Sequence, residues 1–230
     1  MVGVVALFSV GAIVRYGEVT AMSSPLYRFP VRRLSGARCK LDAYSGAVLL
    51  IVNVVSPDPF TRPYGDLELL HRTYFDREFA VLGFRSDDFN HQNTGSSGDT
   101  EVCSTADYDV QFPIFDKIVT KGSNQDPLYR YLTAMQPVAI SPRGSQLLEH
   151  LLRSGYLAQA PARGELLWNF EKFLISRNGK VVARFAPDVT VDQDVILKSI
   201  EQQLKSPMKP RRRTGPVGRI WPPELLTSTY

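Results

Sequence analysis

The chain has 230 residues, of which 43% are apolar and 22% are charged. This composition supports one globular domain with a sizeable core and excludes a wholly disordered chain. The formal net charge of +4 is uneven: the segment 205–230 carries six Lys or Arg residues and one Glu, so the body is nearly neutral and the excess belongs to a basic C-terminal tail.

The first predicted element is an apolar N-terminal segment, residues 1–21. Its run from residue 2 to residue 14 would reach roughly 20 Å as a helix, short of a bilayer core of about 30 Å. That length suits a secretory signal or a short membrane anchor, although no Lys or Arg precedes the run. The alternatives are a docking helix on protein, or translation from Met22 and a cytoplasmic product. An organellar (mitochondrial) location and a secretory or membrane-associated one both stay open.

Residues 22–204 have the order of a single α/β domain. Two short segments, 26–29 and 39–41, predict an N-terminal hairpin. Residues 47–55 form a continuous apolar and β-branched run, which is typical of a strand covered on both faces. A helical pattern over 64–79 and a second buried run over 79–84 follow, and strand, helix, strand predicts a parallel pair with a right-handed crossover.

The second half of the domain predicts antiparallel pairing. The segments 170–175 and 181–185 flank Asn178-Gly179, which is a strong hairpin signal. Residues 191–204 have the pattern of an amphipathic helix that closes the domain. We therefore predict a central mixed β-sheet flanked by helices.

Five local strings occur in the order found in one enzyme family. The matching strings are Val52-Asn53-Val54, Leu82-Gly83-Phe84 with Phe89, Phe112-Pro113-Ile114-Phe115-Asp116-Lys117-Ile118, Pro127-Leu128-Tyr129 and Trp168-Asn169-Phe170-Glu171-Lys172-Phe173-Leu174. Over about residues 26–204 the chain resembles the glutathione peroxidase family. The resemblance implies a thioredoxin-like fold. In intact members it implies reduction of hydroperoxides by a cysteine or selenocysteine, with glutathione or a thioredoxin-type protein as reductant.

The position of the family's reactive cysteine is changed in this sequence. In the family, Val-Asn-Val-Ala leads into Ser-Lys-Cys-Gly, which places the thiol at a helix start that stabilises the thiolate. Here the stretch reads Ser56-Pro57-Asp58-Pro59, so the resemblance puts Asp58 at the nucleophile. A carboxylate cannot pass through a sulfenic acid, and the two prolines remove backbone N–H donors. We therefore expect the peroxidase reaction to be lost.

The other family positions are partly retained. The resemblance puts Asp88 where the family has a glutamine, and it leaves Trp168 and Asn169, which in intact members hydrogen-bond the reactive sulfur. Cys103 lies near the second, resolving cysteine of some members, but it has no partner for an intramolecular cycle. If the family geometry holds, Asp58 and Asp88 approach each other, and their repulsion raises one pKa or recruits a cation; simple solvation is the ordinary outcome.

Metals and bound cofactors are not predicted. Cys39 and Cys103 are too few for a disulfide framework or a structural zinc site. The three histidines, His71, His91 and His150, have no cysteine or carboxylate at ligand spacing, so we expect surface or helix-face positions for them. Glutathione or a thioredoxin-type reductant is expected only if the protein is an active enzyme.

Two segments are candidates for binding protein partners. The stretch 138–165 is longer than in compact members of the family and contains Leu147, Leu148, Leu151 and Leu152 at helical spacing, which suits either binding a partner or covering its own domain. The Pro-rich tail 205–230 suits an extended segment that touches an acidic protein, anionic lipid or RNA.

Three functions are therefore compared. The first is a degenerate peroxidase homologue that serves as a subunit of a larger, membrane-associated or mitochondrial assembly, with membrane contact through residues 2–14. The second is an active thiol-dependent hydroperoxide reductase, of the kind used against oxidative stress, that works through Cys103. The third is nucleic-acid binding through the tail, which the near-neutral body opposes.

Overall fold

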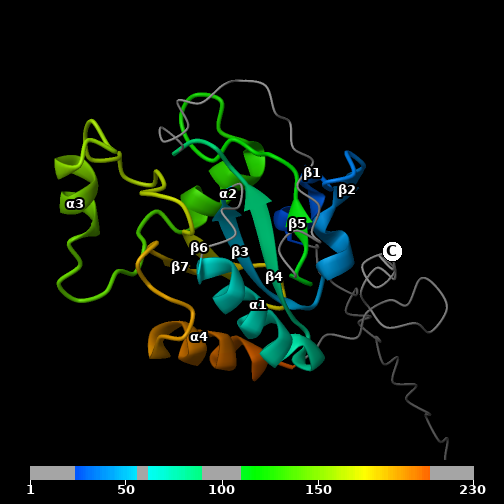
Figure 1. Ribbon diagram of the computed structural model, residues 1–230. Coiled ribbons are helices and arrows are strands. Elements are labelled where there is room, and N and C mark those ends of the chain that lie inside the picture. Colours follow the sequence, from blue (N-terminus) through cyan, green and yellow to red (C-terminus); the bar gives the residue numbers. More distant parts are fainter. Residues whose placement is uncertain (1–23, 56–61, 90–109, 208–230) are drawn as a thin grey trace, which may run out of the picture.

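The computed structural model describes residues 24–55, 62–89 and 110–207 (Figure 1). The apolar segment 2–14, Asp58, Cys103 and the tail from residue 208 onward lie outside the described residues. The strands are β1 (Pro30–Arg32), β2 (Arg38–Lys40), β3 (Val48–Val54), β4 (Phe79–Arg85), β5 (Ile114–Phe115), β6 (Lys172–Ile175) and β7 (Val181–Phe185). The α-helices are α1 (Arg62–Tyr74), α2 (Pro127–Met135), α3 (Leu147–Arg153) and α4 (Asp194–Leu204), with short 3-10 helices at Pro25–Arg28, Leu41–Tyr44 and Phe75–Arg77.

The centre of the fold is a sheet with the strand order β5-β4-β3-β6-β7. β3 pairs parallel with β4, and β4 with β5, whereas β6 pairs antiparallel with both β3 and β7. The predicted mixed sheet is therefore confirmed. All seven residues of β3 are buried, as expected for an apolar strand covered on both faces.

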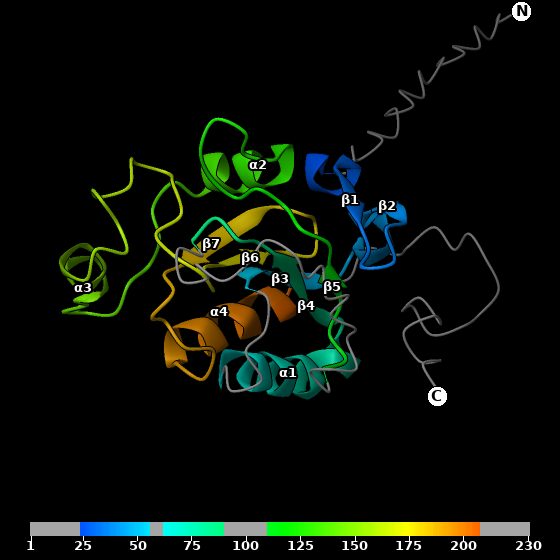
Figure 2. The same ribbon diagram turned by 45° about the horizontal axis from the view of Figure 1, so that its top comes forward.

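Helices cover the two faces of this sheet (Figure 2). On one face, α1 and α4 pack on alternate residues of β3 such as Leu50 and Val52. On the other, α2 and the N-terminal residues pack on Leu49 and Ile51. The alternation follows from the strand period of two, which sends neighbouring side chains to opposite faces.

The N-terminal hairpin differs in its bounds from the prediction. Its strands are β1 and β2, whereas the segment 26–29 lies mainly in the first 3-10 helix. The reason is local: Ser24 caps this helix by accepting the N–H of Leu26, and Pro25 occupies its first turn. The hairpin joins the main sheet through an antiparallel bridge between Arg33 and Phe115.

The predicted hairpin at Asn178-Gly179 is present between β6 and β7. Gly179 has a φ of +77°, and a Cβ there would lie 2.4 Å from the Cβ of Ser24. The hydroxyl of Ser24 donates to the carbonyl of Gly179 at 2.7 Å. Glycine is therefore required both by the turn and by the approach of the N-terminal segment.

The stretch 138–165 leaves the sheet and returns to it. Ile140 forms an isolated bridge with Phe185 at the outer edge of β7, and α3 then stands to one side of the sheet (Figure 1). Leu151 is buried, whereas Leu148 is 38% exposed. In the described part of the chain, no helix combines the length and apolar character needed to cross a bilayer.

Candidate functional site

Asn53, near the end of β3, fastens the segment 168–171 to the central strand. Its Oδ1 accepts the N–H of Glu171 at 2.9 Å, and its Nδ2 donates to the carbonyl of Trp168 at 3.3 Å. Its own carbonyl accepts the N–H of Phe170 at 2.9 Å. Because the side chain is fully buried, these bonds hold Trp168 and Asn169 beside the strand end that leads to position 58.

The backbone of this segment bends at Phe170. Its φ of +62° lies in the left-handed region, which is uncommon for a bulky residue and costs on the order of 1–3 kcal/mol. The ring of Phe170 packs edge-on against Tyr64 of α1 at 5.8 Å. Because the backbone bends at Phe170, Trp168 and Asn169 lie outside β6, which begins at Lys172.

Trp168 is half-buried between two aromatic rings. Phe89, after β4, lies 5.2 Å from it, and Tyr156 of the 138–165 stretch lies 5.6 Å from it. The ammonium of Lys121 sits 4.1 Å from the centre of the Phe89 ring. Trp168 thus packs within the domain, and one of its two ring contacts comes from the 138–165 stretch.

Asn169 is 7% exposed, and its Oδ1 has no hydrogen-bond partner in the described part of the chain. A buried carbonyl oxygen without a donor costs about 1–3 kcal/mol. The residue is therefore available to a further polar group at this end of the sheet.

Asp88 takes part in a local polar cluster after β4. Its Oδ2 accepts the hydroxyl of Thr120 at 2.7 Å and that of Ser86 at 2.9 Å, as well as the N–H of Thr120. The neighbouring Asp87 pairs with Lys117. The expected approach of Asp88 to position 58 falls partly outside the described residues, and within them no group of three or more His, Cys, Asp or Glu is arranged for a metal.

A buried ion pair lies beside the segment that carries Trp168 and Asn169, and the sequence analysis did not predict it. Nε of Arg184 donates to Oε1 of Glu171 at 2.6 Å, and the two side chains are 3% and 0% exposed. The N–H of Leu167 donates to Oε2 of Glu171 at 2.8 Å. Burial raises the pKa of the Glu171 carboxyl, while the Arg184 guanidinium opposes this rise. The register of the β6–β7 hairpin, which pairs Phe173 with Arg184, was the signal that could have revealed the pair.

Arg184 also holds both ends of the 138–165 stretch. Its guanidinium donates to the carbonyls of Gln136 at 3.2 Å, Gly164 at 3.0 Å and Glu165 at 2.6 Å. The same side chain thus connects the segment that carries Trp168 to the stretch that carries Tyr156. Removing it would loosen both.

Two further titratable side chains are buried. Burial lowers the pKa of Lys172 to about 8, and its ammonium donates to the carbonyl of Phe170 at 2.7 Å. His71 is 3% exposed and accepts the N–H of Val81 at Nδ1, so of the two expected positions, surface or helix face, it occupies the buried face of α1. Its apolar neighbours, the rings of Phe75 and Phe112, account for its burial.

Cys39 is the cysteine that the described residues contain. It lies on β2 directly opposite Val31 and packs against the apolar cluster on the α2 side of the sheet. It belongs to the hairpin, and neither aromatic neighbour of Trp168 lies on that element. The described part of the candidate site is therefore a wall made of Trp168 and Asn169, with no thiol among the groups that contact it.

Comparison with known proteins places this arrangement in a family. The family model described as glutathione peroxidase matches residues 26–133. Thioredoxin/glutathione peroxidase BtuE of Escherichia coli is 38% identical over 174 residues, which cover 76% of this chain and 94% of that protein. Hydroperoxy fatty acid reductase gpx1 of Synechocystis is 35% identical over 182 residues, or 79% of this chain and 97% of that protein.

Solved structures agree with the sequence comparison. The crystal structure of Trgpx in apo form superposes with a TM-score of 0.59 at 26% identity, covering 81% of this chain and 99% of that one. The crystal structure of T. cruzi GPX1 gives a TM-score of 0.56 at 27% identity over 78% of this chain and 95% of that one. The thioredoxin-like α/β fold is thereby confirmed. Since the relatives match along nearly their whole length, the chain belongs to the glutathione peroxidase family.

Proposed function

We propose that this protein keeps the scaffold of a glutathione peroxidase but does not turn over hydroperoxides, and that it serves as an interaction or structural subunit of a larger assembly. The observation that carries the proposal is the sequence Ser56-Pro57-Asp58-Pro59, which directly follows β3 and Val55. Asn53 holds Trp168 and Asn169 beside the end of that strand. By the resemblance, Trp168 and Asn169 are retained, and Asp58 stands where intact members have the reactive cysteine or selenocysteine.

The chemistry explains why this exchange matters. Peroxide reduction by the family transfers an oxygen atom to a thiolate or selenolate, which is oxidised by two electrons while the O–O bond breaks. A carboxylate carbon is already at the oxidation level of an acid, and its oxygens cannot form a reducible sulfenic-acid equivalent. Glutathione or a thioredoxin-type reductant would therefore find nothing to reduce at position 58.

A second candidate is a thiol-dependent hydroperoxide reductase that works through Cys103. The relatives named thioredoxin/glutathione peroxidase and hydroperoxy fatty acid reductase are the reason to consider an active reductase, and the role of Cys103 is the further part of this candidate. Retention of Trp168 and Asn169 is also compatible with it. This candidate requires that all turnover depend on Cys103.

Hydroperoxide turnover separates the two candidates. Wild type, Asp58→Cys, Cys103→Ser and the matched control Cys39→Ser are assayed with hydrogen peroxide and with a lipid hydroperoxide, using glutathione and thioredoxin as reductants. The first proposal expects wild type, Cys103→Ser and Cys39→Ser to match the rate without protein. Turnover by wild type that disappears in Cys103→Ser and persists in Cys39→Ser would establish the enzyme instead.

The Asp58→Cys variant tests the retained wall. Recovery of turnover in this variant alone supports a site that lost its nucleophile, and we expect it to be partial because Pro57 and Pro59 still remove two backbone donors. A folded Asp58→Cys protein that reacts with no peroxide would show that the wall too is non-functional.

The interaction role rests on apolar side chains exposed near the start of the 138–165 stretch. Met135 is 50%, Val138 63% and Ile140 42% exposed. Such side chains are enriched where proteins bind one another. Protein contacts through the tail 205–230 and membrane contact through residues 2–14 belong to the same proposal and need separate truncations. Nucleic-acid binding through the tail is a separate function, which the near-neutral body opposes. Copurification with wild type but not with Val138→Ser, judged against Leu69→Ser on the exposed face of α1, is the expected result.

A further inference from the structure

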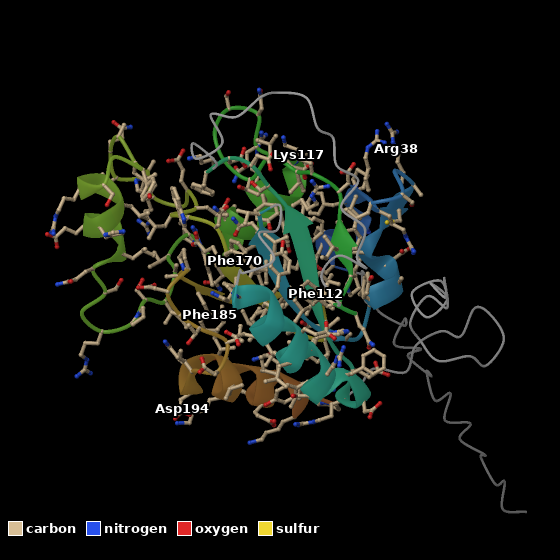
Figure 3. All side chains as sticks on the ribbon, viewed as in Figure 1. Arg38, Phe112, Lys117, Phe170, Phe185 and Asp194 are labelled. Carbon is tan, nitrogen blue, oxygen red and sulfur yellow. The ribbon has the colours of Figure 1, made fainter. Side chains whose placement is uncertain are left out.

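A groove lies between the N-terminal hairpin and the loop that follows β5. Its volume is about 320 Å³, which is the lower end of the range of small-molecule sites. Its walls are Pro30, Val31, Arg32, Arg38, Phe84, Asp116, Lys117, Ile118 and Asp126. Figure 3 shows Arg38 on the hairpin and Lys117 on the facing loop, both near the end of the molecule to which β4 points. Clefts beyond the carboxyl ends of parallel strands are common binding places in α/β folds.

Two arginines of this groove face each other without a counter-ion. Arg32 of β1 and Arg38 of β2 are direct cross-strand partners, so their side chains leave the same face of the hairpin. Both are exposed. Arg32 makes one long hydrogen bond, 3.5 Å, to the carbonyl of Gly36, and neither arginine forms an ion pair within the described residues.

Like charges directly opposite each other destabilise a two-stranded ribbon. An oxyanion between them would relieve the repulsion, because each guanidinium presents a planar fork of donors that matches a carboxylate or a phosphate. The arrangement is therefore unfavourable in the empty groove and favourable when an anion is bound.

The other residues that line the groove indicate the chemistry of the part of the ligand that does not contact the arginines. Pro30 and Ile118 supply accessible apolar surface near the arginines, whereas Phe84 and Val31 are only 1% and 5% exposed. Asp116 and Asp126 also line the groove, and their Oδ1 atoms accept the N–H groups of Lys117 at 2.7 Å and Leu128 at 2.8 Å. These carboxylates disfavour a ligand that is anionic at both ends.

We propose that this groove binds a small organic anion, with its anionic group between Arg32 and Arg38 and an apolar, non-anionic body along Pro30 and Ile118. The site is separate from Trp168 and Asn169, and the proposal holds whether or not the protein reduces peroxides. It identifies a ligand class, a monophosphate or carboxylate on an apolar body, that the fold alone does not assign.

Three probes isolate the two halves of the ligand. 1-Naphthyl phosphate has both, pyrophosphate has the anion without an apolar body, and 1-naphthol has the body without the anion. Binding to the full chain is measured by calorimetry at constant ionic strength, since surface charge effects are screened by salt. We expect 1-naphthyl phosphate to bind at least about tenfold more tightly than either other probe, because two sets of contacts add.

Variants then assign the binding to the arginines. Arg38→Gln is expected to weaken 1-naphthyl phosphate binding by about tenfold to a hundredfold, the loss of one charge-assisted pair. Arg38→Lys should retain part of the affinity, because it keeps the charge and loses the fork. Arg163→Gln, an exposed arginine outside the groove, is the control and should bind as wild type does.

The result that overturns the proposal is equally specific. Equal weakening by Arg38→Gln and Arg163→Gln, or no preference for 1-naphthyl phosphate over pyrophosphate, would show general attraction of anions to a basic protein. Absence of binding by all three probes to a folded wild type would also reject it. Because Arg38 is exposed and repelled by Arg32, Arg38→Gln is expected to fold, which circular dichroism and the melting temperature verify.

Discussion

Replacing Glu171 by glutamine is expected to destabilise the protein through the guanidinium that it leaves behind. Arg184 is 3% exposed, and Glu171, its only carboxylate partner within the described residues, is 0% exposed. Removing one partner of a buried ion pair costs about 3–5 kcal/mol, since the remaining charge stays out of water. Three carbonyls still accept from Arg184, which places the expected cost of Glu171→Gln near the lower end, about 3 kcal/mol.

This free energy is large enough to measure by heat and by urea. For a domain of this size, about 3 kcal/mol corresponds to a fall in melting temperature of about 6–12 °C. The matched control is Glu149→Gln, which breaks the ion pair with Arg153 on the surface of α3, where the side chains are 64% and 73% exposed. An exposed pair of this kind contributes about 0.5 kcal/mol or less.

A local measurement follows from the same contacts. Arg184→Met removes the donors to Gln136, Gly164 and Glu165, so hydrogen exchange should accelerate first in the 138–165 stretch and around Trp168. If Glu171→Gln melts within about 2 °C of Glu149→Gln, the reasoning about the buried pair is refuted. Uniform acceleration across α1 and α4 in Arg184→Met would likewise contradict a clamp on this stretch.

Two other changes test the packing. Burial lowers the pKa of His71 from 6.5 to about 4, so the unfolded protein binds this proton more readily than the folded protein does. The free energy of unfolding should therefore fall by about 2 kcal/mol between pH 6.5 and pH 4.5. In urea titrations at these two pH values, His71→Gln should show a smaller fall. An unchanged pH dependence in the variant would rule out His71 as the cause. Glu78 has a φ of +59° at the end of a 3-10 helix. Glu78→Gly should therefore stabilise the protein by about 0.5–1 kcal/mol and raise its melting temperature. A lower melting temperature would count against backbone strain at this position.

The central sheet was predictable because its signals are local. The buried run 47–55 contains β3, and the Asn178-Gly179 turn identifies the β6–β7 hairpin. The start of α4 was placed three residues early, because Val191 is buried before the helix begins at Asp194. The segment 26–29 was called a strand because its apolar residues do not reveal the capping by Ser24.

The candidate site was predictable only where a family string marks it. Trp168 and Asn169 were identified from their string, yet their attachment to Asn53 joins positions 115 to 118 residues apart. The Glu171–Arg184 pair depends on the register of two strands, and the burial of His71 depends in part on the ring of Phe112, which a distant loop contributes. Such contacts follow from the three-dimensional arrangement and leave no local pattern of composition or periodicity.

The attachment of Trp168 to Asn53 has a consequence for how such a protein changes over generations. The wall of the site is held by the side chain and the carbonyl of Asn53 in the central strand, and none of these hydrogen bonds involves the side chain at residue 58. A single codon change can therefore silence the chemistry while the product still folds and accumulates. Selection is then free to act on the outer surfaces, and a gene that began as one for a catalyst can be kept for what its product binds.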